Sequence, residues 1–263
     1  MNYENIKFQI ENGIAQLTLN RPEKLNSFTQ AMHLEVRHAL DALQADKSVR
    51  VLLLTGAGRG FCAGQDLSDR AVEPGAKGVD LGESVEKFYA PLVLTLRSLP
   101  MPVICAVNGV AAGAGANLAL ACDIVLAAKS ASFVEVFCKL GLIPDTGGTW
   151  ILPRLIGPAR ATGLAMLGEK LSAETAEQWG LIWKSVADTA LMDEALAMAE
   201  HFAAAPTKGL AFTKKAFQAS YANTLPEQLK LEGEMMRELG YSHDYREGVA
   251  AFVAKRPAHF KGE

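Results

Sequence analysis

The sequence contains few cysteines, and no two of them are spaced as a C-x-x-C pair. The four that occur, each in an apolar stretch, are Cys62, Cys105, Cys122 and Cys138. Cysteines so widely separated argue against a disulfide framework and against a structural zinc site. We therefore expect buried, reduced thiols, as in a protein of the cytoplasm.

The chain also lacks a strong net charge and a long apolar run. Its net charge of −3 gives no electrostatic reason to expect nucleic acid or an anionic membrane surface as a partner. No apolar run approaches the roughly 20 residues that cross a bilayer, and the polar residues 1–11 do not resemble a signal peptide. With 49% hydrophobic and 21% charged residues, the 263-residue chain has the composition of an ordinary globular protein with a large core.

Two glycine-rich bends, each following a short apolar strand, are the features around which the chain is organised. Residues 103–107 are apolar and rich in β-branched side chains, and residues 113–115 then lead into a predicted helix. Residues 49–55 lead in the same way into the bend at 56–67. If the two strands are parallel neighbours, both bends open at one edge of the sheet, where ligands of open α/β sheets bind.

By itself, the bend at Gly113, Ala114 and Gly115 allows two interpretations. Unpaired N–H groups at the start of a helix, together with the positive end of its dipole, stabilise an anion or a developing oxyanion. Alternatively, the small residues serve only to pack the helix tightly on the strand. The bend is not a dinucleotide fingerprint, because Leu118 stands where the third glycine would be.

Hydrophobic periodicity predicts a strand-rich N-terminal part and, beyond Pro158, helices only. Alternation around Asn12-Gly13 predicts a hairpin over residues 7–19, and Thr29 is a suitable N-cap for a helix that ends near Asp46. The remaining predicted elements are a helix over 83–98, strands over 123–128 and 132–136, and helices over 158–168, 172–180, 190–205, 207–220, 226–239 and 244–254.

Two further segments indicate how the chain is divided into a core, a loop or lid, and a helical region. Residues 68–82 are polar and contain proline and several glycines, which predicts either a solvated loop or a lid over the site. Ala205-Pro206 marks the predicted boundary between a core, residues 1–205, and a helical region, residues 206–263. So many amphipathic helices after a strand-rich core indicate burial between chains, so we expect an oligomer.

Several motifs, in the order in which they occur along the chain, resemble those of the crotonase (enoyl-CoA hydratase/isomerase) superfamily. The resemblance extends over essentially the whole chain. The motifs are LNRPEKLNS at 19–27, GFCAGQDL at 60–67, AVNGVAAGAG at 106–115, CD at 122–123, GLIP at 141–144, GGT at 147–149 and EGVAAFVAKR at 247–256. The resemblance implies an α/β fold, a crotonase-like spiral of ββα units with a C-terminal α-helical trimerisation region. It also implies an acyl-CoA substrate, no cofactor beyond the CoA moiety of that substrate, and a homotrimer or a homohexamer built as a dimer of trimers.

The resemblance gives the two bends one shared role, because the family binds the thioester oxygen with two backbone N–H groups. The matching positions are Gln65 and Ala114, which would form an oxyanion hole for an enolate. Phe252 and Lys255 match residues that reach the CoA of a neighbouring subunit, and a spacing of three would place them on one helix face. The implied substrate- and CoA-binding residues are Lys24, Leu25, Ala63, Asp66, Leu67, Gly113, Asn117, Phe137, Phe252 and Lys255.

The two glutamates of the hydratases are absent from their positions in this sequence. Asn117 and Phe137 stand there instead, and neither side chain can activate a water molecule. Asp145 lies where hydratases commonly have a glycine, just before a predicted helix. Taken alone, Asp145 fits an N-cap. Within the family it matches the acid/base carboxylate of the isomerases, which take a proton from one carbon and return it at another.

Residues 58–67, 142–150 and 244–248 resemble a branch of the family that isomerises the ring epoxide of an aromatic acyl-CoA thioester to an oxepin. The alternatives are an isomerase that moves the double bond of a linear 3-enoyl-CoA, and a non-catalytic acyl-CoA-binding protein. A pocket for the ring would be lined by Phe88, Tyr89, Phe137 and Trp150, unless these are ordinary core residues.

The other polar candidates have simpler interpretations. Asp66 is expected to cap the following helix or to lie near the adenine of CoA. The five histidines are expected to be ordinary surface residues, and no cluster has the spacing of metal ligands. They are His33, His38, His201, His243 and His259.

Overall fold

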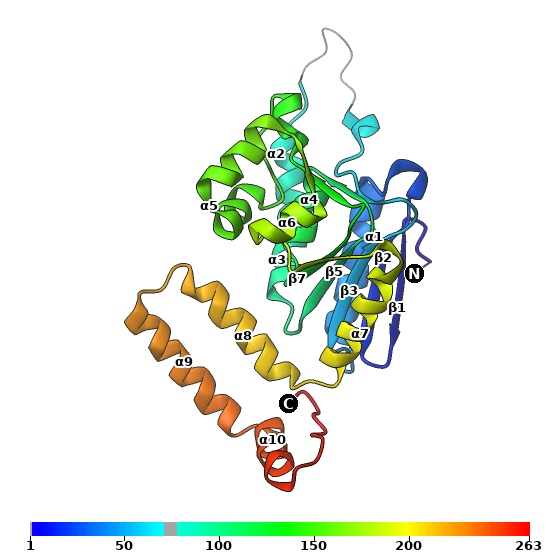
Figure 1. The fold of residues 1–263 in the computed structure, drawn as a ribbon. Coiled ribbons are helices and arrows are strands. Elements are labelled where there is room, and N and C mark those ends of the chain that lie inside the picture. The colour runs from blue at the N-terminus through cyan, green and yellow to red at the C-terminus, as the bar shows by residue number, and fades with distance from the viewer. Residues whose placement is uncertain (1, 71–77) are drawn as a thin grey trace.

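The computed structural model describes residues 2–70 and 78–263, and its centre is a six-stranded sheet of strand order β1-β2-β3-β5-β7-β10 (Figure 1). The predicted hairpin is confirmed, since β1 and β2 pair antiparallel, and the other pairings in this sheet are parallel. All residues of β3 and β5 are buried, as in a parallel sheet covered on both faces. The strands are β1 (Ile6–Glu11), β2 (Ile14–Leu19), β3 (Val51–Gly56), β5 (Val103–Val107), β7 (Ile124–Ala128) and β10 (Lys184–Val186).

A second sheet has four strands in the order β4-β6-β8-β9. β4 follows β3, β6 follows β5 and β8 follows β7, each after a short connection, and a helix follows each pair. This repetition confirms the predicted spiral of ββα units. Because β3 and β5 are parallel neighbours, the two glycine-rich bends do open at one edge of the sheet. The strands are β4 (Gly60–Cys62), β6 (Val110–Ala112), β8 (Ser132–Val134) and β9 (Lys170–Ser172).

Helices cover both faces of the six-stranded sheet (Figure 1). α7 packs across β2, β3, β5 and β7 on one face. On the other face, Val36 of α1, Leu92 of α3 and Leu118 of α4 meet the leucines of β2 and β3. Thr29 is the N-cap of α1, as predicted, with its hydroxyl accepting from the N–H of Met32 at 3.3 Å. The helices are α1 (Gln30–Ala45), α2 (Leu81–Ser84), α3 (Ala90–Ser98), α4 (Ala114–Leu120), α5 (Gly148–Leu167), α6 (Ala173–Trp179), α7 (Leu191–Ala203), α8 (Thr207–Ser220), α9 (Leu225–Gly240) and α10 (His243–Ala254).

Three predicted elements differ from those observed. Residues 83–98 form parts of α2 and α3 joined by a π-helical turn at Val85–Tyr89. The prediction of helices only beyond Pro158 is wrong, because β9 and β10 have three residues each, too few to establish a period. α5 begins at Gly148 and kinks at Gly157, whose φ of +75° interrupts the helical pattern. Residues 71–77 of the predicted loop or lid lie outside the described residues.

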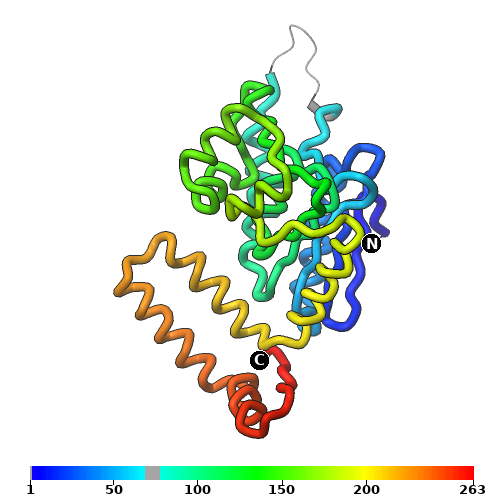
Figure 2. The backbone as a smooth tube through the Cα atoms, in the orientation of Figure 1, coloured from blue at the N-terminus to red at the C-terminus, as the bar shows by residue number. Residues whose placement is uncertain are grey.

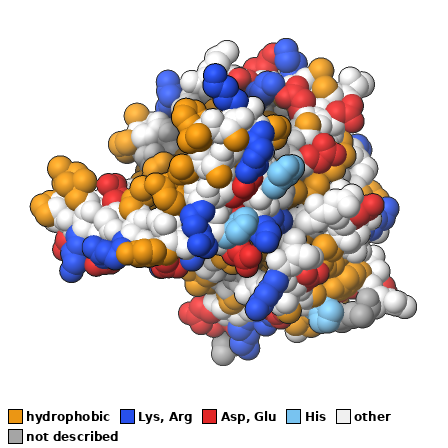
Figure 3. Space-filling model, turned by 90° about the horizontal axis from the view of Figure 1, so that it is seen from below, with side chains coloured by type: hydrophobic (Ala, Val, Ile, Leu, Met, Phe, Trp, Pro, Cys, Tyr) orange, Lys and Arg blue, Asp and Glu red, His pale blue; other side chains and the backbone are white. Residues whose placement is uncertain are grey.

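The last three helices extend away from the two sheets. α8 and α9 run side by side, and α10 lies below them at the bottom of the view (Figures 1 and 2). The C-terminal tail returns to the helices, because the Asp244 carboxylate accepts from the N–H groups of Lys261 and Gly262 at 2.7 Å. Large apolar side chains lie exposed along these helices, among them Phe217, Leu225, Leu229, Met236, Phe252 and Val253 (Figure 3). Within the described residues, no helix combines the length and the apolar character that a membrane span requires.

Candidate active site

The two glycine-rich bends touch each other, and two glycines permit the contact. A Cβ atom at Gly64 would lie 2.9 Å from the carbonyl oxygen of Ala112 and 3.2 Å from the nitrogen of Ala114. A Cβ atom at Gly115 would lie 2.2 Å from the carbonyl oxygen of Cys62. Gly64 also has a φ of +91°, which favours glycine. A side chain at either position would therefore push the two bends apart.

Main-chain pairing with Phe28 holds the first bend around Gln65. The N–H of Phe28 donates to the oxygen of Gly64 at 2.7 Å, and the N–H of Asp66 donates to the oxygen of Phe28 at 2.9 Å. The Gln65 side chain donates to the same Phe28 oxygen at 3.0 Å and accepts from the Tyr89 hydroxyl at 3.0 Å. The side chain of Gln65 thus holds the bend in place.

The second bend leads directly into α4, a helix whose residues are all buried. Gly113, the N-cap of α4, has a φ of +53°, and its N–H donates to the oxygen of Val134 at 2.8 Å. Ala114 is the first residue of α4, where N–H groups have no partner within the helix. Because Ala114 also lies against Gly64, the start of α4 adjoins the bend that holds Gln65.

Asp145 lies in the turn between β8 and α5. Its Oδ1 accepts from the Thr146 hydroxyl at 2.8 Å, and its main-chain oxygen accepts from the N–H of Gly148 at 2.8 Å. The N-cap of α5 is Gly147, so the structure does not support the interpretation of Asp145 as the cap. Thr146 has a φ of +53°, a conformation that costs energy in a β-branched residue and is concentrated at functional sites.

Asn117 connects α4 to the Asp145 turn. Its side-chain Nδ2 donates to the main-chain oxygen of Asp145 at 3.0 Å and to Oε2 of Glu135 at 3.3 Å. The Asn117 side chain occupies the space that a Cβ at Gly148 would need, since such a Cβ would lie 2.4 Å from Nδ2. Asn117 is wholly buried. Its position therefore fixes the main chain around Asp145.

Glu135 is a site residue that the sequence analysis missed. Its side chain is 1% exposed and follows β8, next to the bend at Gly113. The pKa of Glu135 is raised to about 7, mainly by burial; the bond from Asn117 opposes this shift, and the negative charge of Asp145 adds to it. Alternation along the predicted strand over 132–136 would have placed Glu135 on the same buried face as Phe133. The expectation of a single carboxylate in the site is therefore incomplete.

The four aromatic residues expected around a ring do not form one group. Phe137 packs beside Gly113, 3.6 Å from the position of a Cβ there. Phe88 and Tyr89 instead surround His33, with ring centroids 5.1 and 4.5 Å from the imidazole. The ring of Trp150 lies elsewhere, with its centroid 5.2 Å from that of Tyr221, the C-cap residue of α8. His33 is 5% exposed, so the prediction of a surface histidine is wrong there; α1 turns it toward the core.

The turn at residues 21–28 and the bend at 57–66 form one bonded unit. The buried Asn26 amide, which the sequence analysis did not single out, donates to the carbonyl oxygens of Gly60 and Phe61 at 2.9 and 3.0 Å. The N–H of Ala63 donates to the oxygen of Leu25 at 2.9 Å. These bonds bring five of the predicted substrate-binding residues together, namely Lys24, Leu25, Ala63, Asp66 and Leu67.

Asp66 has the expected capping role. Its carboxylate accepts from the hydroxyl and the N–H of Ser68 at 2.6 and 3.1 Å and pairs with Arg21 at 3.0 Å. These partners, the Ser68 hydroxyl first, lower the pKa of Asp66 to about 2. Asp66 is therefore ionised at neutral pH and does not serve as a proton donor.

Phe252 and Lys255 lie far from Asp145 within one chain, because α10 stands at the opposite end of the molecule from α5 (Figure 1). Phe252 is 85% exposed. Lys255 follows the end of α10 with a φ of +52°, so the prediction that the two residues share one helix face is wrong. The helix ends before Lys255, and a left-handed C-cap turns the chain away.

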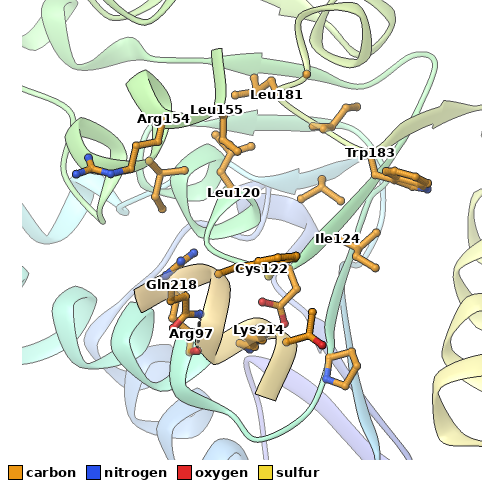
Figure 4. A pocket seen from close by; sticks show the side chains of 18 of the residues that line it. Arg97, Leu120, Cys122, Ile124, Arg154, Leu155, Leu181, Trp183, Lys214 and Gln218 are labelled. Carbon is orange, nitrogen blue, oxygen red and sulfur yellow. Dashed lines mark hydrogen bonds and ion pairs between the residues drawn. The ribbon is translucent and has the colours of Figure 1, made fainter. Parts of the chain in front are cut away.

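A cavity of about 570 Å³ lies between α8 and the core rather than at Asp145 (Figure 4). Lys214 of α8 pairs there with Asp123 at 2.8 Å. Burial raises the pKa of Asp123, and Lys214 opposes that shift. Most of the lining is apolar and includes Trp183 and Leu155. Nowhere in residues 2–70 and 78–263 do three or more metal-ligating side chains gather.

The chain is similar to known proteins over nearly its whole length. Residues 9–263 match the family model described as "Enoyl-CoA hydratase/isomerase". The "1,2-epoxyphenylacetyl-CoA isomerase" of Escherichia coli (strain K12) is 58% identical over 260 residues, which cover 99% of each chain. A Rhodobacter capsulatus protein named "Probable enoyl-CoA hydratase" is 48% identical over 100% of each chain. The crystal structure of an enoyl-CoA hydratase from Bacillus anthracis superposes with a TM-score of 0.90, at 35% identity, over 99% of this chain and 100% of that one.

Proposed function

This chain belongs to the enoyl-CoA hydratase/isomerase family, and from that premise we propose that it is an isomerase of acyl-CoA thioesters. Its substrate is 2-(1,2-epoxy-1,2-dihydrophenyl)acetyl-CoA, and its product is the isomeric oxepin-CoA, a step of phenylacetate degradation. The relative with 58% identity over 99% of both chains, which is named for isomerising an epoxyphenylacetyl-CoA, supports this choice of substrate.

One observation supports the chemistry: the turn of Asp145 is bonded to α4, and α4 begins beside the bend of Gln65. We assign Asp145 as the acid/base that takes a proton from the carbon next to the thioester carbonyl and returns a proton at another carbon. The backbone N–H groups of Gln65 and Ala114 are assigned to the enolate oxygen. Losing one such donor typically raises the barrier by about 3 kcal/mol.

Hydration requires a group that activates water, and the two hydratase positions do not supply it. Asn117 spends both N–H bonds of its amide on Asp145 and Glu135. Phe137 is apolar and 6% exposed. Both observations favour isomerisation over the addition of water. The proposed reaction uses no metal and no cofactor beyond the CoA moiety of the substrate.

Turnover of two substrates tests the proposal. The full chain is assayed with 2-(1,2-epoxy-1,2-dihydrophenyl)acetyl-CoA and, separately, with a linear 3-enoyl-CoA, and products are identified as isomers of unchanged mass. We expect the higher kcat/KM with the ring epoxide. Turnover of the linear thioester alone would show that the protein is an isomerase, but one that acts on a linear 3-enoyl-CoA and not on the ring epoxide. Binding of both thioesters without turnover would show a non-catalytic acyl-CoA-binding protein.

Assembly into a homotrimer or homohexamer is part of the proposal. Residues 1–205 would form the acyl-CoA-binding core and residues 206–263 the oligomerisation region. The support is the exposed apolar surface of α8, α9 and α10, since such surfaces mark sites of protein contact. In the assembly, Phe252 would stack on the adenine and Lys255 would pair with a phosphate of CoA held by a neighbouring subunit. The four free thiols support a cytoplasmic location.

A further inference from the structure

Glu135 is a buried carboxyl group placed between the two halves of the candidate site. Its backbone follows Val134, whose oxygen accepts from Gly113 at the start of the second bend. Its side chain meets Asn117, which also holds the main chain of Asp145. Glu135 is 1% exposed, and burying a carboxyl group so completely costs much folding free energy unless a partner compensates. Such a group is therefore expected to have a partner or a function.

Among the residues that the structure describes, no cation is found to act on Glu135. α4 presents Asn117, and the turn before α5 presents Asp145, the titratable group whose charge acts on Glu135 in the described part of the chain. Lys139 and Cys138 follow on the next turn, where the Cys138 thiol points to the main-chain oxygen of Glu135 at 4.0 Å. None of the ion pairs among the described residues includes Glu135. Its main electrostatic neighbour is therefore another carboxylate.

We propose that Glu135 is a positioning residue for Asp145, which holds the Asn117 amide in place and, when ionised, makes the Asp145 carboxylate a stronger base. This inference rests on the proposed function, in which Asp145 is the acid/base. Two nearby carboxylates repel each other, and a proton on either one relieves the repulsion. An ionised Glu135 consequently increases the proton affinity of Asp145. Because the pKa of Glu135 is raised to about 7, this change falls in the neutral range.

The pH dependence of kcat/KM separates this role from a purely structural one. Between pH 6 and pH 8 we expect kcat/KM of the unaltered protein to rise by about threefold to tenfold as Glu135 ionises. Glu135→Gln keeps the shape and an acceptor for Asn117 but cannot ionise, so its profile should be flat over this range, with KM little changed. Glu135→Asp, the matched control, keeps the charge and should keep the rise.

If kcat/KM of Glu135→Gln still rises between pH 6 and pH 8, the proposal is wrong, whatever maximum value kcat/KM reaches. A folded Glu135→Gln without activity at any pH would also overturn it, because the carboxyl group would then be needed for more than its charge. Asp145→Asn distinguishes a failure of the proposed function from a failure of the role given to Glu135. If Asp145→Asn is fully active, the proposed function is wrong; if it is inactive while the Glu135→Gln profile keeps its rise, only the role of Glu135 is wrong.

A measurement without any Glu135 variant covers the case in which Glu135→Gln does not fold. Infrared difference spectroscopy follows the C=O band of a protonated carboxyl group during a pH titration. In the unaltered protein we expect a buried carboxyl group that loses its proton near neutral pH. In Asp145→Asn the charge beside it is gone, so the midpoint should move to lower pH. An unchanged midpoint would overturn the coupling of Glu135 to Asp145.

Discussion

Asn117 Nδ2 lies 3.0 Å from the main-chain oxygen of Asp145, so an amide holds the turn at a position where hydratases of the family carry a glutamate. The same nitrogen contacts Glu135 at 3.3 Å. Position 117 thus connects the carboxylate of Glu135 to the main chain of Asp145. The turn before α5 is therefore held by an amide group, which also reaches the buried carboxylate of Glu135.

Asp145→Asn should abolish nearly all turnover while acyl-CoA binding remains. The substitution removes the base and keeps an oxygen that accepts from the Thr146 hydroxyl. Loss of a general base typically lowers kcat by about 10²-fold to 10⁴-fold. Asp188→Asn is the control, because Asp188 accepts from the N–H of Ser130 at 3.0 Å on an exposed surface away from the site. Turnover within a few-fold of the unaltered protein would show that Asp145 is not the acid/base.

Gly148→Ala should impair activity through Asn117. The new Cβ would lie within 2.7 Å of three atoms of the Asn117 side chain, which is buried and has no room to move. We expect a loss of about 1–3 kcal/mol in stability. We also expect a lower kcat, because the displaced Asn117 amide no longer donates to the main-chain oxygen of Asp145. Gly163→Ala, in the same helix, meets no atom within 4 Å and should leave kcat unchanged. Equal behaviour of the two variants in kcat and thermal unfolding would refute the role given to Asn117.

Hydration of a 2-enoyl-CoA should be at least about a hundredfold slower than isomerisation, because Asn117 and Phe137 cannot transfer protons. Addition of water is measured by loss of the enoyl absorbance, with a hydratase of the family as the positive control. A chelator should not change the isomerisation rate. Rapid hydration, or activity that a chelator removes and a divalent metal restores, would contradict the proposed chemistry.

Lys255→Ala should raise KM for the acyl-CoA and leave kcat nearly unchanged, because a phosphate contact is the same in the ground and transition states. Lys47→Ala, which removes an exposed lysine from the loop after α1, should change neither constant. The mass in solution, measured by sedimentation, should be that of three or six chains. A fully active monomer would show that the site is complete within one chain and that Lys255 does not reach it.

The stability of the protein should fall, relative to that of Glu135→Gln, as the pH rises from about 4.5 to about 7. The pKa of Glu135 is raised from 4.5 to about 7, so the folded state binds more protons than the unfolded state in this window. Over this whole pH range, the contribution of Glu135 to the free energy of unfolding changes by about 3 kcal/mol. Thermal unfolding of both proteins at pH 5 and pH 8 checks this. A gap in Tm that is equal at the two pH values would mean that Glu135 is ionised throughout.

Local features of the sequence determined much of the architecture. Asn12-Gly13 sets the first hairpin, because this pair adopts the left-handed conformations of a tight turn. Thr29 starts α1, because its hydroxyl accepts from the backbone three residues later. The identities of Asp145, Asn117 and Phe137 were enough to predict an isomerase instead of a hydratase. Each of these inferences concerns a residue and its near neighbours, which is the range over which a sequence is informative.

The tertiary structure decided what depends on residues far apart in the chain. Glu135 became part of the site because Asn117, 18 residues earlier, turns toward it from α4. β9 and β10 are strands because β8 and β7 supply their hydrogen-bonding partners. His33 is buried because α1 carries it against aromatic rings from another helix. Burial, pairing and the charge of a neighbour arise only when distant segments pack, and periodicity does not record which segments will meet.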